Sequence, residues 1–113
     1  MIYFAYGMNT NFTEMANRCP KAQNLGGATL HDHEFRFSNH ADIIEYPGFN
    51  VQGALWDITE DCVKALDNLE GYPYYYDRKM VEVVHNDSGK KFTAMTYFMV
   101  GERVDSPPTE GYL

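Results

Sequence analysis

The clearest helix signal in this 113-residue chain is TEDCVKALDNLEG, residues 59–71. Thr59 is a favourable N-cap, and the acidic residues after it lie where the helix macrodipole favours negative charge. Gly71 is placed to end the helix. The apolar residues recur at helical spacing and predict the face that packs against a core: Val63, Leu66 and Leu69.

Extended segments surround this helix. Apolar and alternating patterns predict strands at 2–6, 25–37, 51–58, 79–85 and 91–100. A short N-terminal helix is predicted from Thr13 to Arg18, and Pro47-Gly48 predicts an irregular loop over 38–50. About five or six strands with one main helix indicate an α+β fold, in a single domain covering 1–113, whose sheet closes into a small barrel.

Composition excludes several classes of function. The formal charge is −7, and the nine Lys and Arg residues are scattered, so nucleic-acid binding is not expected. No apolar run reaches the about 20 residues of a membrane span, and the N-terminus lacks the basic start of a signal peptide. Cys19 and Cys62 have the option of pairing, but free thiols are expected in an unsecreted chain. We therefore expect a cytoplasmic protein.

The helical periodicity makes Glu70 the main candidate for a catalytic residue. It follows Leu66 by four residues and Val63 by seven, which places it on the same helical face as the core residues. Loss of hydration and the negative end of the macrodipole both raise the pKa of such a carboxyl group, which suits general acid–base catalysis. The alternative is that Gly71 breaks the helix early and Glu70 points to solvent. Asp67 falls off the stripe and is interpreted as a solvated charge.

Two other groups of residues are weaker candidates for binding sites. In YGMNTN, residues 6–11, the glycine allows a sharp turn after the first strand that leaves successive N–H groups free to bind an anion. A plain turn is the alternative. His31 and His33 share a face if the segment is a strand, which is compatible with a metal site. Because no other ligands cluster nearby, surface-strand histidines are preferred, and no metal or cofactor is expected.

Several segments occur in the order of known family motifs. They are YFAYGMN at 3–9, GALW at 53–56, ALDNLEGYP at 65–73 followed by YDR at 76–78, and PPTEGY at 107–112. Together they resemble the γ-glutamylcyclotransferase-like family, whose motifs are Tyr-Gly-Ser-Asn, Leu-Asp-x-x-Glu-Gly, Tyr-x-Arg and a Pro-rich stretch with a closing tyrosine. The resemblance implies a small mixed β-barrel with flanking helices.

The resemblance also implies an activity and its residues. Glu70 matches the family's general acid/base, and the loop of Tyr6, Gly7, Met8 and Asn9 matches the segment that holds the glutamyl α-carboxylate through backbone amides. Tyr76 and Tyr112 match tyrosines of the substrate site. The implied reaction releases 5-oxoproline from a small-molecule γ-glutamyl amine, amino acid or dipeptide, when the α-amine attacks its own γ-carbonyl.

Two departures from the family pattern affect the substrate more than the fold. Met8 replaces the usual serine, which removes a hydroxyl group but keeps the backbone N–H. The chain ends at Leu113, short of the C-terminal helix of many longer members, which allows a homodimer or a different acyl amine. The rival hypothesis is a non-catalytic module that binds a small molecule or protein on the same fold.

Overall fold

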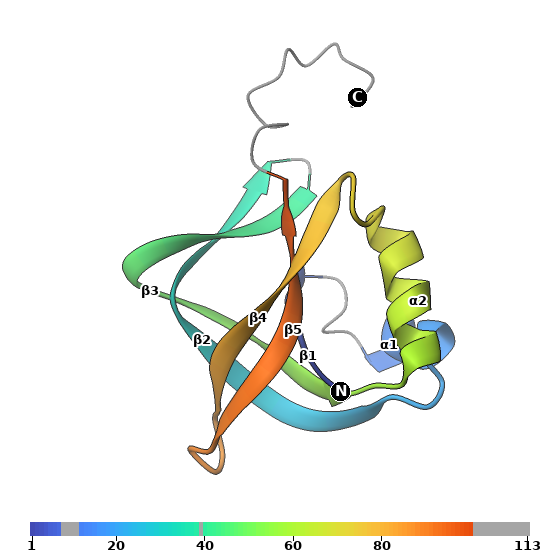
Figure 1. Ribbon diagram of the computed structural model, residues 1–113. Coiled ribbons are helices and arrows are strands. Elements are labelled where there is room, and N and C mark those ends of the chain that lie inside the picture. The colour runs from blue at the N-terminus through green and yellow to red at the C-terminus, as the bar shows by residue number, and fades with distance from the viewer. Residues whose placement is uncertain (8–11, 39, 101–113) are drawn as a thin grey trace.

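Five strands close into a barrel with two helices against its outer wall (Figure 1). The computed structural model describes residues 1–7, 12–38 and 40–100. The strands are β1 (Ile2–Ala5), β2 (Gln23–Ser38), β3 (His40–Asp57), β4 (Tyr76–His85) and β5 (Lys91–Met99), and the helices are α1 (Phe12–Arg18) and α2 (Glu60–Glu70).

The barrel order is β1-β3-β2-β4-β5. The β1–β5 pair is parallel and the other pairs are antiparallel, so the sheet is mixed. The predicted α+β barrel is therefore confirmed, with five strands in the described part of the chain. None of the helices described is long and apolar enough to cross a membrane.

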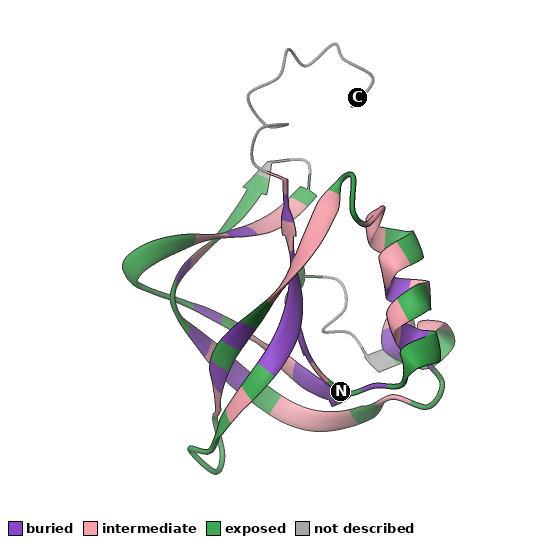
Figure 2. Ribbon diagram, viewed as in Figure 1, coloured by how far each residue is buried: buried purple, intermediate pink, exposed green. Residues whose placement is uncertain are grey.

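Two apolar clusters hold the barrel and helices together. One fills the barrel and includes Phe4, Leu30, Leu55 and Val83, all at most 2% exposed. The other lies between the barrel wall and the helices, and Figure 2 shows the buried residues of α2 on its barrel-facing side. Leu66, fully buried in this second cluster, contributes about 1.5–3 kcal/mol by burial and holds α2 to the wall.

The ends of α2 follow the predicted signals. The Thr59 side chain accepts a hydrogen bond from the Cys62 N–H at 3.3 Å, which satisfies one of the donors that a helix start leaves open. Gly71 adopts the left-handed conformation with φ 69°, and a Cβ there would lie 2.5 Å from the Tyr75 ring. A glycine is therefore required at the point where the helix ends, directly after Glu70.

The prediction of a loop over 38–50 was wrong. β2 and β3 form one long hairpin whose pairing runs from Gln23↔Asp57 to Ser38↔His40. Pro47-Gly48 lies in a bulge opposite Asp32, whose carboxylate accepts from the Gly48 N–H at 3.0 Å. The turn signal marks this bulge, which interrupts the pairing without reversing the chain.

The expectation of free thiols was also wrong. Cys19 and Cys62, at a sequence separation of 43, form a disulfide, and both are almost fully buried. Cys19 directly follows α1 and Cys62 lies in the first turn of α2. The bond therefore ties the two helices together, and sequence spacing gave no sign that they would meet.

Candidate active site

Glu70 is the last residue of α2 and is partly buried. The stripe that faces the barrel contains Cys62 and Leu66, so Glu70 continues it at the next turn. Leu69, predicted on the same face, is instead 43% exposed. Burial raises the pKa of the Glu70 carboxyl above its ordinary value of 4.5, and the Arg18 guanidinium partly opposes that rise. The direction is the one that the sequence pattern predicts.

Tyr6 follows β1 at the same end of the barrel. Its hydroxyl donates to the Tyr97 carbonyl oxygen at 2.5 Å, and its ring meets the edge of Phe35. Burial raises the pKa of the Tyr6 phenol far above 10.0, and the carboxylates of Asp42 and Glu70 add to the rise. The phenol is therefore neutral, and Glu70 lies close enough to act on it electrostatically.

Part of the predicted substrate loop lies outside the described residues. Gly7 has φ 74°, the left-handed conformation that favours glycine. A Cβ on Gly7 would lie 3.3 Å from the Ala41 side chain, in tight contact. Met8, Asn9 and Tyr112 belong to the ranges that the structure does not describe, so their predicted roles stay predictions.

Tyr76 begins β4, and its hydroxyl donates to the Ala41 carbonyl oxygen at 2.5 Å. Asp42, the next residue, accepts from the Met99 N–H at 2.8 Å. Burial raises the pKa of the Asp42 carboxyl, against the effect of that hydrogen bond. The sequence gave no signal for Asp42, because it lies in the segment interpreted as a loop.

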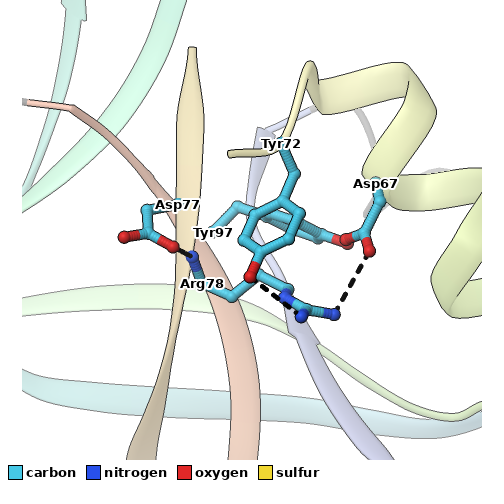
Figure 3. Close-up of polar contacts among 5 residues, drawn as sticks. All are labelled: Asp67, Tyr72, Asp77, Arg78 and Tyr97. Carbon is cyan, nitrogen blue, oxygen red and sulfur yellow. Dashed lines mark hydrogen bonds and ion pairs between the residues drawn. The ribbon is translucent and has the colours of Figure 1, made fainter. Parts of the chain in front are cut away.

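Asp67 was interpreted as a solvated charge, and this was wrong. Figure 3 shows it among residues of β4, β5 and the turn after α2. Its carboxylate accepts from the Tyr97 hydroxyl at 2.7 Å and from the Arg78 guanidinium at 3.2 Å. Arg78 also donates to the Tyr72 hydroxyl at 3.0 Å and stacks 4.0 Å from the centroid of that ring. This network fixes α2 against the barrel one turn before Glu70.

His31 and His33 do not share a face, contrary to the sequence expectation. A bulge shifts the register between them, and Asp32 has φ 60°. His31 is exposed and bonds to Asn50, whereas His33 is 8% exposed and lies 3.2 Å from the Lys79 ammonium. Within 1–7, 12–38 and 40–100 no three His, Cys, Asp or Glu side chains group to hold a metal.

The end of the barrel thus brings together a partly buried carboxyl group, the neutral Tyr6 phenol and a left-handed glycine. This arrangement is compatible with proton transfer beside an anion-binding turn. The sequence model of the family described as gamma-glutamyl cyclotransferase, AIG2-like, matches residues 3–112. The chain belongs to this family.

Individual relatives agree with the family assignment. The gamma-glutamylcyclotransferase of Homo sapiens is 28% identical over 123 residues, which cover 98% of this chain and 65% of the human one. A protein of Methanocaldococcus jannaschii is 35% identical over 68 residues, 56% of each chain. This member therefore spans 56–65% of the length of these relatives.

A solved structure of a gamma-glutamyl cyclotransferase superposes with a TM-score of 0.78 at 28% identity. The match covers 88% of this chain and 66% of that one. An AIG2-like protein from Mus musculus, at 20% identity, has a TM-score of 0.75 and shares the fold. The mixed barrel with its flanking helices is therefore the fold of the family.

Proposed function

We propose that this chain is a cyclotransferase that releases 5-oxoproline from γ-glutamyl compounds, with Glu70 as its general acid/base. One observation carries the proposal: a carboxyl group with a raised pKa ends α2 beside Tyr6 and its turn, in a chain of the gamma-glutamyl cyclotransferase family. A carboxyl group whose pKa is raised by burial, at the end of a barrel, is a physically reasoned candidate for a functional site.

The reaction needs one group that removes a proton and later returns it. The Glu70 carboxylate takes a proton from the substrate α-ammonium, and the free amine attacks the γ-carbonyl carbon. Once bonded to the carbon, the attacking nitrogen is positively charged and loses its second proton to solvent. As the five-membered ring closes, the bond from that carbon to the leaving nitrogen breaks, and the protonated Glu70 gives its proton to this nitrogen, so that the ring keeps a neutral amide N–H. The products are 5-oxoproline and a free amine, and such proton transfers contribute about 10²–10⁴-fold in rate.

The substrate supplies its own nucleophile, so the protein must mainly hold it folded with the amine near the carbonyl. The turn that begins at Tyr6 and Gly7 is the proposed cradle for the glutamyl α-carboxylate, with Met8 and Asn9 completing it. The left-handed glycine favours convergent backbone N–H groups at this point. Tyr76 and Tyr112 are proposed to line the same site.

The test is 5-oxoproline release from a panel of γ-glutamyl amines, amino acids and dipeptides. Glu70→Gln should lower the rate by about 10²–10⁴-fold. Glu60→Gln is the matched control, since Glu60 is an exposed glutamate at the other end of the same helix. A Gln variant as active as wild type at position 70 would overturn the mechanism.

Met8, in place of the family serine, favours the rival function of a non-catalytic binding module. Binding of γ-glutamyl compounds without 5-oxoproline release would support that rival.

The cytoplasmic location also stays a prediction. Because disulfides persist mainly in oxidising compartments, the redox state of Cys19 and Cys62 in cells bears directly on it.

A further inference from the structure

The outer segment of β2, residues 30–38, has an edge that no neighbouring strand covers. The barrel closes between β2 and β4 through two residue pairs, Ala28↔His85 and Thr29↔Val84. Beyond them β2 continues in its pairing with β3, and within the described part of the chain no strand pairs with its other side. The backbone N–H and C=O groups along such an edge are available to a further strand.

This edge is exposed and carries aromatic side chains. Phe35 is 44% exposed and Phe37 is 68% exposed, and Arg36 between them is exposed as well. Figure 2 shows the outer part of β2 mainly in the colour of exposed residues. Addition of a strand to an exposed edge is a common mode of protein association. Charged residues on an edge often discourage such pairing, but here their order favours one particular partner.

The order of the charges points to a second copy of this chain. Glu34 and Arg36 lie on one face of β2, and Arg36 Nε is 3.0 Å from Glu34 Oε1. When two copies of β2 pair antiparallel around a two-fold axis at Phe35, Glu34 of each copy lies opposite Arg36 of the other. Opposite charges across a strand pair are stabilising, whereas like charges are destabilising. The strand is therefore complementary to itself.

Neighbouring positions of the axis lack this complementarity. An axis at Glu34 or at Arg36 places that residue opposite the same residue of the second copy, so like charges meet. An axis at His33 places Asp32 opposite Glu34 of the second copy, which again brings two negative charges together. Among the axes from His33 to Arg36, only the one at Phe35 brings opposite charges together without a like-charged pair. The charges thus specify the register of the pairing.

The other face of the same pairing is aromatic. Phe35 and Phe37 are two residues apart in a strand, so they share a face. The axis at Phe35 places the Phe35 rings of the two copies opposite each other, and each Phe37 lies opposite His33 of the other copy. Cross-strand aromatic pairs stabilise a sheet, so both faces of the paired strands are complementary.

We propose that two copies of this chain form a symmetric dimer in which their β2 strands pair antiparallel around Phe35. The two hairpins then form one continuous sheet in the order β3-β2-β2-β3. The proposal goes beyond the cyclotransferase function and does not depend on it. The surface nonetheless adjoins the candidate active site, because the centroid of the Phe35 ring lies 6.1 Å from that of Tyr6.

The test reverses the charge at each of the two positions. Arg36→Glu brings negative charges together across the pair, and Glu34→Arg brings positive charges together. Each single variant should raise the dissociation constant of the dimer roughly 10- to 100-fold, because two favourable charge pairs become unfavourable. Sedimentation-velocity ultracentrifugation over a concentration series measures this constant, and circular dichroism checks that each variant is folded.

Two combinations should restore the dimer. The double variant Glu34→Arg, Arg36→Glu exchanges the two charges and recovers opposite pairs across the axis. An equimolar mixture of the two single variants should form a heterodimer, since one copy then presents two negative charges and the other two positive charges. Recovery on mixing separates a lost contact between copies from a loss of folding.

Glu45→Arg is the matched control. Glu45 is an exposed residue of β3 in the same hairpin, and its reversal changes the net charge by the same amount as Glu34→Arg. It should leave the dissociation constant unchanged. A wild-type chain that stays monomeric over the whole series overturns the proposal, and so does a dimer that neither single variant weakens. Single variants that stay monomeric when mixed would also overturn it.

Discussion

The Tyr97 hydroxyl lies 2.7 Å from the Asp67 carboxylate, so a buried phenol of β5 bonds to α2 one turn before Glu70. The same carboxylate pairs with Arg78 of β4. Two strands thus converge on one acidic residue of the helix, and this contact sets where the helix ends relative to the barrel. Glu70 depends on it for its position.

Removal of the Asp67 carboxylate should therefore lower the free energy of unfolding more than removal of the Tyr97 hydroxyl. Asp67→Ala leaves a buried phenol without its acceptor and Arg78 without its carboxylate, and should lower the free energy of unfolding by about 2–3 kcal/mol. Tyr97→Phe removes one donor cleanly and should cost about 1 kcal/mol. Urea unfolding measures both.

Asp61→Ala is the control, because Asp61 is an exposed acid of the same helix. Its free energy of unfolding should be close to that of wild type. Equal costs for Asp61→Ala and Asp67→Ala would show that the network contributes nothing to stability.

The disulfide should account for a large share of the stability of the chain. A cross-link that closes 43 residues stabilises by about 4 kcal/mol in the chain-entropy description. Reduction of wild type with dithiothreitol should therefore lower the urea midpoint strongly, and the Cys19→Ala, Cys62→Ala double variant should behave like reduced wild type. An unchanged midpoint after complete reduction would contradict the prediction.

Stability should depend on pH through Glu70. Because the folded pKa is raised above 4.5, the folded state binds the proton more tightly than the unfolded state. The stability from this group is complete below pH 4.5 and is lost as the pH rises through the folded value. Glu70→Gln removes this loss, so its free energy of unfolding relative to wild type should improve between about pH 4 and about pH 7.

Urea unfolding of both proteins at the two pH values measures this change. The Asp42 carboxyl, whose pKa burial also raises, is present in both proteins, so its contribution cancels in the difference. A relative stability that is independent of pH, or that worsens for the Gln variant as the pH rises, would show that Glu70 titrates normally.

Where the sequence carried a local physical signal, it predicted the structure. Thr59 and Gly71 end α2 as expected, because capping depends on the residue and its immediate backbone. The raised pKa of Glu70 followed from its spacing after Leu66. The hairpin over 38–50 was missed, since Pro47 was interpreted without the partner strand that accommodates it as a bulge.

Contacts between distant segments carried no such signal. Cys19 meets Cys62 across 43 residues, and Lys79 meets His33 across 46. The inward direction of His33 depends on the bulge in which Asp32 alone faces residues 46–49 of β3, and a strict alternation of side chains does not anticipate such a bulge.

The sequence by itself thus determined the strands outside 38–50, the main helix with its caps and the face of that helix that Glu70 occupies, because each depends on residues within a few positions of one another. Only the tertiary structure decided the disulfide, the partners of Asp67 and the contact between Lys79 and His33. Those depend on how the barrel closes, which brings together side chains that no local spacing relates.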